Sequence, residues 1–174
     1  EEELVTLTTT LCQLFSQEFF LWQNKTELTS QINRTVEYLV SRLMVKKTKA
    51  GFLSLSEEQN DHFNLSIVAN CIDETIQRYG IVLSILQKEH KISRSTLEKD
   101  ALTLAKRLST LHNINGPEFV DKRAQATIVN ALKDFDYLVV DDCGSLIPGE
   151  ELERLTQDVY KLVDTEVLQS IKRH

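Results

Sequence analysis

The histidines are the residues of this sequence best suited to acid–base or metal chemistry. They stand far apart, at His62, His90, His112 and His174. None has another His or Cys four residues away, the spacing that aims two side chains of one helical face at the same metal ion. The sequence therefore predicts exposed or partly packed histidines.

Four carboxylates near the end of the chain could hold a hard cation, because carboxylate oxygens are the ligands that Ca²⁺ and Mg²⁺ prefer. Asp141 and Asp142 follow a predicted strand, and Glu150 and Glu151 begin a predicted helix. Carboxylates are common in turns and complement the dipole at a helix start. We interpret the group as a solvated turn and an acidic first helical turn, and we predict no metal ion.

The glycines are Gly51, Gly80, Gly116, Gly144 and Gly149. A serine hydrolase of the Gly-x-Ser-x-Gly type needs two glycines around its nucleophile, and no such motif occurs. A phosphate-binding loop needs several glycines close together at a helix start, so that backbone amides can approach the anion. The sequence predicts neither site, and it predicts no cofactor and no catalytic residue.

The charge balance argues against a nucleic-acid-binding protein. With 26 acidic and 20 basic residues the net charge is −6, whereas phosphate binders gain affinity from clustered cations. Lys46, Lys47 and Lys49 lie in a predicted hairpin, where a winged-helix DNA binder would contact the backbone. The matching second turn carries Asp141 and Asp142, which would repel phosphates. We therefore predict no nucleic-acid partner.

A second basic cluster consists of Lys88, His90, Lys91 and Arg94. It follows the apolar run 81–86, which is expected to be buried and is far shorter than the roughly 20 residues of a membrane-spanning helix. Such a cluster could touch anionic lipid headgroups or a partner. An ordinary solvated loop is the favoured alternative.

The cysteines and the first residues indicate the setting of the chain. Cys12, Cys71 and Cys143 are odd in number and widely spaced, which suits neither a disulfide framework nor a zinc site and favours a reducing cytosol. The chain opens with Glu1 rather than with Met or an apolar leader. We expect a piece of a larger protein.

Apolar residues with helical spacing predict a mainly α-helical chain with two short β-hairpins. In the first half the expected elements are helices over 4–22, 24–43 and 56–88 and a hairpin of 44–48 and 52–55. Asn24 supplies capping chemistry, and Ser56 with Gln59 has capping-box spacing. The third helix has potential breaks near Phe63 and Gly80.

The second half shows the same order of elements. The expected elements are helices over 95–111, 117–135 and 150–168 and a hairpin of 137–140 and 145–147. Ser95 and Glu98 have capping-box spacing, and Pro117 fits the first position of a helix, where its missing N–H would be unpaired anyway.

A shift of 93 or 94 positions superposes the two halves. It places Gly51 on Gly144, Leu53 on Leu146 and Glu57 on Glu150. Two successive units of helix, helix, hairpin and helix are expected from a tandem of winged-helix-like modules. We predict one unit over 1–90 and a second over 91–174, packed on the first; one compact domain is the alternative.

Several segments resemble a known family. Residues 75–79 read TIQRY, 93–99 read SRSTLEK, and 104–109 read LAKRLS. Residues 111–122 read LHNINGPEFVDK, which resembles the block LHGINAPEFFDK in the membrane-associated sn-glycerol-3-phosphate acyltransferases of enteric bacteria. The likeness covers about residues 75–138.

The block departs from the family pattern at three positions. Asn113, Gly116 and Val120 stand where that pattern has Gly, Ala and Phe. The swaps indicate a diverged relative.

The resemblance implies the first committed step of phospholipid synthesis at the bacterial inner membrane. The family transfers a fatty acyl group from acyl carrier protein or coenzyme A to the 1-hydroxyl of glycerol 3-phosphate, with a His-x4-Asp motif whose His is the general base. Five residues after His62, His90 and His112 stand Ile67, Ser95 and Pro117 rather than Asp, and His174 is last. The implied role is a non-catalytic C-terminal accessory domain, peripheral on the cytoplasmic face of the membrane, that supports or regulates the catalytic domain of the same polypeptide.

Residues of the resembling segments are candidates for a docking surface or an interdomain core. They are Arg78, Tyr79, Pro117, Glu118, Phe119, Asp121 and Lys122. The alternative is that they are purely structural: a helix start, a core phenylalanine and solvated charges. For the chain as a whole, the competing interpretations are a free-standing winged-helix-like interaction module and a self-sufficient enzyme.

Overall fold

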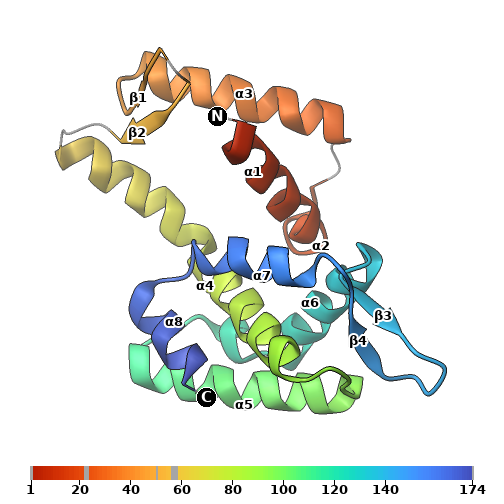
Figure 1. Cartoon of the computed structure of the whole chain (residues 1–174). Coiled ribbons are helices and arrows are strands. Elements are labelled where there is room, and N and C mark those ends of the chain that lie inside the picture. Colours follow the sequence, from red (N-terminus) through yellow and green to blue (C-terminus); the bar gives the residue numbers. More distant parts are fainter. Residues whose placement is uncertain (1, 22–23, 50, 56–58, 174) are drawn as a thin grey trace. The chain divides into compact units, whose positions relative to one another are not determined.

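The computed structural model of the chain describes residues 2–21, 24–49, 51–55 and 59–173 (Figure 1). These residues fold into α-helices and two small antiparallel sheets, which confirms the predicted fold class. They form two compact units, residues 1–71 and 72–174. The predicted domains 1–90 and 91–174, and their winged-helix character, stay predictions. No helix in the described ranges is long and apolar enough to cross a bilayer.

The first unit begins with α1 (Glu2–Leu14) and α2 (Ser16–Phe19). The single predicted helix over 4–22 is wrong, because the helix is divided at Phe15, which lies between α1 and α2, and α2 ends at Phe19. Phe20 adopts a left-handed conformation with φ 53°, and its N–H bonds to the carbonyl of Ser16 as a C-cap.

α3 (Lys25–Ser41) packs on α1. Its N-terminus is a capping box: Asn24 Oδ1 accepts from the N–H of Glu27 at 3.0 Å, and Glu27 Oε2 accepts from the N–H of Asn24 at 3.3 Å. The predicted capping role of Asn24 is thus confirmed. Four apolar side chains of these helices are buried: Leu11, Leu14, Ile32 and Val36.

The first predicted hairpin is confirmed as β1 (Val45–Lys47) and β2 (Leu53–Leu55). Val45 pairs with Leu55 and Lys47 with Leu53. The turn between the strands closes through Gly51, whose φ of 80° favours a residue without a side chain.

α4 (Gln59–Lys88) passes from the first unit into the second (Figure 1). The helix is continuous, so the predicted breaks near Phe63 and Gly80 are wrong. Gly80 serves packing instead: a Cβ there would lie 3.1 Å from Val163 Cγ2. The run 81–86 is buried as predicted. Ser56 of the predicted capping box lies outside the described residues.

α5 (Arg94–His112) buries a stripe along one face, as its spacing predicts. The buried residues are Leu97, Ala101, Leu104, Ala105 and Leu108. The N-cap is Ser93, whose Oγ accepts from the N–H of Thr96 at 3.1 Å. The predicted capping box of Ser95 and Glu98 is therefore wrong.

The predicted helix over 117–135 divides into a 3-10 turn, η1 (Pro117–Val120), and α6 (Lys122–Asp134). The division occurs because Asp121 is extended, with φ −83° and ψ 129°, and its side chain caps α6 through the N–H of Arg123. Pro117 does begin its helical turn as predicted.

The second predicted hairpin is confirmed as β3 (Leu138–Val140) and β4 (Leu146–Pro148). Leu138 pairs with Pro148, and Leu146 also forms a bridge with Ile92, with N–O distances of 3.0 and 2.8 Å. Leu138 and Leu146 are buried. This hairpin is thus part of the core of the second unit.

Two helices end the chain where one was predicted over 150–168. They are α7 (Leu152–Tyr160) and α8 (Thr165–Lys172). Asp164 separates them, because its Oδ1 accepts from the N–H groups of Glu166 and Val167 at 2.8 and 3.2 Å and so starts a new helix.

The local backbone of the two units repeats at an offset of 93 residues. All six described residues with positive φ form three pairs at this offset: Phe20 with Asn113, Leu43 with Asp136, and Gly51 with Gly144. The hydrogen bonds agree, since Met44 N bonds to Leu39 O at 3.0 Å and Tyr137 N to Leu132 O at 2.9 Å. The internal repeat predicted from sequence is therefore visible in the backbone.

Candidate functional site

The block 111–122 links α5 to α6 (Figure 1). Asn113 ends α5 in a left-handed conformation with φ 53°, and its N–H bonds to the carbonyl of Ser109. The Ser109 hydroxyl in turn donates to the carbonyl of Ile114 at 2.8 Å. Glycine and asparagine are the residues that best tolerate this conformation. Asn113 is therefore suited to this conformation, as a glycine at the same position would be.

Gly116 lies against the carboxylate of Glu74 on α4. Its N–H donates to Glu74 Oε1 at 3.2 Å, and a Cβ at this position would clash with that carboxylate. The family pattern has Ala here. In this chain the absent side chain allows Glu74 to hold the start of η1, so the link is fixed to α4 by a charge-assisted hydrogen bond.

Phe119 anchors the link, because its side chain is completely buried. Its carbonyl accepts from Nε2 of Gln125, also completely buried, at 3.5 Å. The other amide atom, Gln125 Oε1, has no hydrogen-bond partner among the described residues. The predicted core role of Phe119 is correct.

The remaining residues of the block that we selected are exposed. Pro117 and Glu118 lie on η1, and Asp121 and Lys122 lie at the start of α6. Asp121 caps α6, so its carboxylate has a structural partner. The side chains of Glu118 and Lys122 are also exposed. None of the hydrogen bonds and ion pairs described above gives them a structural role.

Arg78 and Tyr79 lie in the interior of the second unit rather than on its surface. Tyr79 is completely buried and Arg78 is 3% exposed. Arg78 Nη2 donates to Thr75 Oγ1, one helical turn earlier, at 2.9 Å. The candidates thus separate into three buried residues and four exposed ones, and their docking role stays a prediction.

The carboxylates of the acidic group predicted near the end of the chain have different surroundings. Asp141 closes the second hairpin turn, because Oδ1 accepts from the N–H groups of Cys143 and Ser145 at 2.9 and 2.8 Å. Lys91 Nζ lies 2.5 Å from its Oδ2. The hydrogen bond from Lys91, together with those from the backbone, lowers the pKa of Asp141. Asp142 and Glu150 are exposed.

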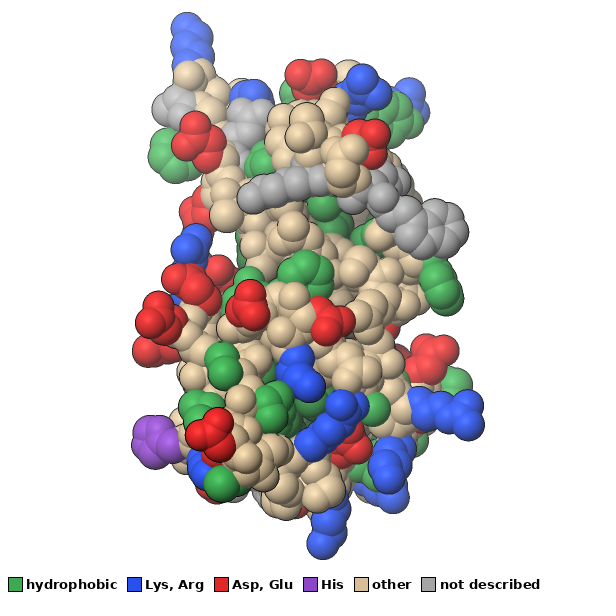
Figure 2. Space-filling view, turned by 90° about the vertical axis from the view of Figure 1, so that its right-hand side faces the viewer, with side chains coloured by type: hydrophobic (Ala, Val, Ile, Leu, Met, Phe, Trp, Pro, Cys, Tyr) green, Lys and Arg blue, Asp and Glu red, His purple; other side chains and the backbone are tan. Residues whose placement is uncertain are grey.

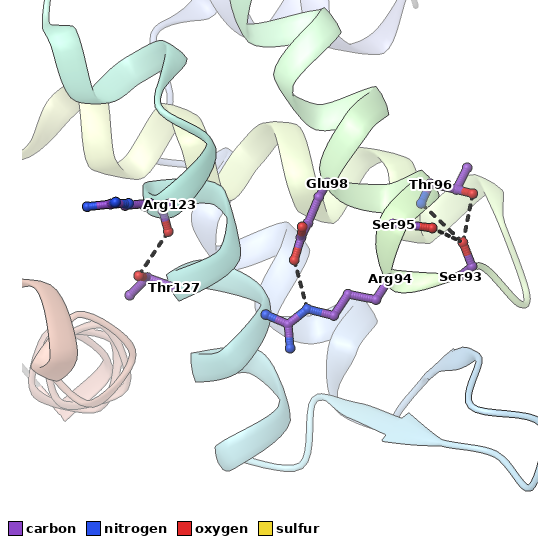
Figure 3. A network of polar contacts seen from close by, with 7 residues as sticks. All are labelled: Ser93, Arg94, Ser95, Thr96, Glu98, Arg123 and Thr127. Atoms are coloured by element: carbon purple, nitrogen blue, oxygen red, sulfur yellow. Dashed lines mark hydrogen bonds and ion pairs between the residues drawn. The ribbon is translucent and has the colours of Figure 1, made fainter.

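The basic cluster of Lys88, His90, Lys91 and Arg94 is partly neutralised by ion pairs that were not predicted from the sequence. Besides the pair of Lys91 with Asp141, Arg94 Nε lies 2.7 Å from Glu98 Oε1, one turn along α5, in the polar network of Figure 3. The four-residue spacing between Arg94 and Glu98 is the sequence pattern that indicates this ion pair. The face drawn in Figure 2 shows basic, acidic and hydrophobic side chains, with several basic ones toward its lower end.

The described histidines have different surroundings. His112 Nε2 lies 3.0 Å from Ser170 Oγ, which connects α5 to α8. His90 is exposed at the rim of a depression of about 530 Å³ that Glu150 and Glu153 also line. Within the described ranges, no three His, Cys, Asp or Glu residues are grouped to hold a metal ion. The side chains of His62 and His174 lie outside the described residues.

Comparison with known proteins assigns the class of this helical chain. Residues 1–141 match the family model described as the glycerol-3-phosphate acyltransferase C-terminal region. The chain therefore belongs to this family of acyltransferase C-terminal regions, which confirms the resemblance found in the 111–122 block.

The relatives carry a more specific name. The chain is 38% identical over 173 residues to the glycerol-3-phosphate acyltransferase of Colwellia psychrerythraea and 31% identical over 172 residues to that of Alteromonas mediterranea. Each match covers 99% of this chain and 21% of the relative. That of Haemophilus influenzae is 34% identical over 155 residues, which cover 89% of this chain and 18% of the relative. The chain thus spans about one fifth of the length of these relatives.

Proposed function

We propose that this chain is the non-catalytic C-terminal accessory region of a glycerol-3-phosphate acyltransferase and that it supports or regulates the catalytic domain of the same polypeptide. The whole protein would transfer an acyl group from acyl carrier protein or coenzyme A to glycerol 3-phosphate for phospholipid synthesis. The observation that carries the proposal is the match of residues 1–141 to the C-terminal family model. The missing His-x4-Asp motif agrees with it, because that motif supplies the general base.

The 111–122 block is the proposed contact with the catalytic domain. Phe119 and the Glu74–Gly116 hydrogen bond hold its backbone in place, so that Glu118 and Lys122 are presented on a rigid support. A preorganised surface loses little conformational entropy on docking.

The proposed location is the cytoplasmic face of the bacterial inner membrane.

A direct assay tests the proposed lack of catalysis. The 174-residue chain, given glycerol 3-phosphate and an acyl donor, should form no acylated product, while a full-length relative assayed in parallel should. Turnover by the chain alone would refute the proposal.

Two variants in the full-length protein test the docking surface. Glu118→Ala and Lys122→Ala should lower acyltransferase activity while the C-terminal region stays folded, because the residues are exposed. Lys106→Ala, an exposed residue of α5 outside the block, is the matched control. Equal activity of all three variants would remove the 111–122 block from the proposed interface.

A free-standing winged-helix-like interaction module is the second candidate, and the two helix-to-hairpin units favour it. Such a module would fold and bind its partner without a catalytic domain. Salt-titrated binding to duplex DNA tests its nucleic-acid form, since phosphate contacts weaken steeply with ionic strength. We expect little binding at physiological salt.

A further inference from the structure

The first unit has an open apolar groove between α1 and α3. The hollow measures about 360 Å³, and its walls include Leu4 and Cys12 of α1 and Ile32, Val36 and Leu39 of α3. Leu4 is 40% exposed, and Cys12 and Leu39 are half-buried. A hollow of this size with mainly apolar walls is typical of a binding site, whereas the voids of a packed core are far smaller. We call it the α1–α3 groove.

The second unit has the same face in a covered form. α5 and α6 match α1 and α3 at the offset of 93 residues, and each pair of helices packs together. At seven of the ten positions that line the groove, the matched residue is completely buried. These residues are Leu97, Ala101, Ala105, Gln125, Ile128, Val129 and Leu132. The matched helices thus bury in the second unit a face that they leave open in the first.

A central helix accounts for this burial. The second half of α4 lies in the middle of the second unit, with α5, α6, α7 and α8 around it (Figure 1). Every residue from 75 to 86 is buried, and a helix is buried all round only where other elements surround it. Gly80 lets this helix lie close to Val163 and Ile171. The helix ends at Lys88, shortly before α5 begins at Arg94.

The first unit has no match for this central helix. At the offset of 93 the match would precede Glu1 and would end shortly before α1, as α4 ends shortly before α5. A match for α8, which packs on α5, is missing too, because residues 72–79 are part of α4 and belong to the second unit. Asp164 caps and starts α8, whereas the matched Cys71 has no carboxylate and α4 continues. The described part of the first unit therefore provides no helix to fill the α1–α3 groove.

We propose that, in the full-length polypeptide, the α1–α3 groove binds an amphipathic helix that directly precedes Glu1. The inference rests on the proposed function, which places a catalytic domain before this chain, and the chain covers only 21% of a full-length relative. With four turns and a short link like that between α4 and α5, the helix lies within about 25 residues of Glu1. Apolar residues spaced three and four apart form the face that contacts the groove. This helix would fix the first unit to the rest of the polypeptide.

Photocrosslinking in the full-length polypeptide tests which segment occupies the groove. Gln31 lines the groove and is exposed, so Gln31→p-benzoylphenylalanine places a photoreactive side chain there without removing a buried group. After irradiation and digestion, mass spectrometry should find its crosslinks in the segment directly before Glu1. The matched control is Tyr38→p-benzoylphenylalanine, at an exposed position of α3 that does not line the groove. The control should give no crosslink to that segment.

Other crosslinks identify other occupants and would overturn the proposal. They are crosslinks from position 31 to a second copy of the protein, to a copurified lipid or to a distant part of the same polypeptide. The absence of any crosslink from position 31, or equal crosslinking of the upstream segment from position 38, would also overturn it.

Cys12 gives a second measurement with the natural side chain in the groove. Burial raises the pKa of its thiol, so its reaction is compared at one pH in the 174-residue chain and in the full-length polypeptide. N-ethylmaleimide should modify Cys12 at least about tenfold more slowly in the full-length polypeptide, because the thiol reacts only when the covering helix opens. Equal rates would overturn the proposal.

Two variants of the full-length polypeptide assign the protection of Cys12 to the groove. Leu4→Asp introduces a charge into the groove wall and should restore the faster modification, because a buried carboxylate weakens the binding of an apolar helix. Tyr38→Asp is the control and should leave Cys12 protected. Equal modification in the two variants would contradict the assignment.

The inference and the proposed function fail separately. Crosslinks and thiol modification are measured without an acyltransferase assay. Turnover by the 174-residue chain alone would refute the proposed function and would leave the crosslinks from position 31 unchanged.

Discussion

The two hairpins share a backbone but differ in what their side chains do. In the second hairpin Leu138 and Leu146 are buried and Ile92 adds a bridge to the sheet. In the first hairpin the matched strand residues Val45 and Leu53 are only half-buried. The same hairpin backbone therefore contributes buried side chains to the core of the second unit and carries more exposed side chains in the first.

The largest expected effect concerns the matched pair Leu146 and Leu53. Leu146→Ala should destabilise the second unit by about 2–5 kcal/mol, because it removes a buried side chain and leaves a cavity. Leu53→Ala should cost below about 1 kcal/mol in the first unit, because less surface is buried there. Amide hydrogen exchange resolved by unit measures both. Equal costs would contradict the difference between the hairpins.

The two turn glycines test what the hairpins share. Gly51→Ala and Gly144→Ala should each cost about 1–2 kcal/mol, because both have φ 80° and no atom within 4 Å of the added Cβ, so the cost is conformational alone. Chemical denaturation measures the loss. A large cost at one position and none at the other would show that the turns are not equivalent.

Leu43 and Asp136 form a pair with an expected gain. Leu43→Gly should stabilise the first unit by about 1 kcal/mol, because glycine relieves the left-handed strain at little cost in burial. Asp136→Gly should gain less, since Asp tolerates this conformation better. Thermal unfolding of both variants shows whether each substitution stabilises or destabilises the protein. Destabilisation by Leu43→Gly would contradict backbone strain at Leu43.

The smallest expected effect is a pH dependence confined to the second unit. The pKa of Asp141 is lowered from its ordinary value of 3.8 in the folded state. Its stabilising contribution is therefore present above pH 3.8 and is lost as the pH falls through the lower folded pKa. Asp141→Thr introduces the residue found at the matched position, Thr48, whose Oγ1 accepts from Phe52 N at 3.1 Å.

The variant should reduce the loss of stability that occurs as the pH falls below 3.8, measured by denaturation at several pH values. If the stability of the wild-type protein and of the variant falls equally with pH, a stabilising role of the ionised carboxylate is contradicted. Lys91→Gln is the control, because it removes the first cause of the lowered pKa and leaves the carboxylate in place.

Local patterns were sufficient to predict the hairpins, the buried face of α5 and the buried run 81–86. They depend on apolar spacing and on turn residues such as Gly51 and Gly144 that act within a few positions. The helix divisions at Asp121 and Asp164 could not be predicted this way. Each depends on one Asp side chain that accepts from nearby N–H groups, a contact that apolar spacing does not reveal.

The candidate site was predicted through the resemblance, and the structural interpretation correctly had Phe119 in the core and Asp121 and Lys122 in solvent, but the burial of Arg78 was not predicted. The burial of Arg78 depends on the surrounding fold as well as on its local contact with Thr75. The Glu74–Gly116 hydrogen bond joins residues 42 positions apart, beyond the reach of any local pattern. The left-handed Phe20 and Leu43 were missed because large apolar residues do not signal such a conformation.

The three positive-φ pairs have a practical consequence for engineering. The spacing from Phe20 to Leu43 and on to Gly51 equals that from Asn113 to Asp136 and Gly144. The segments between these landmarks therefore have equal length, and the hairpin 44–55 can be exchanged for 137–148 without insertion or deletion. Such a graft offers a chimera in which the loop chemistry is transplanted while the chain length is kept.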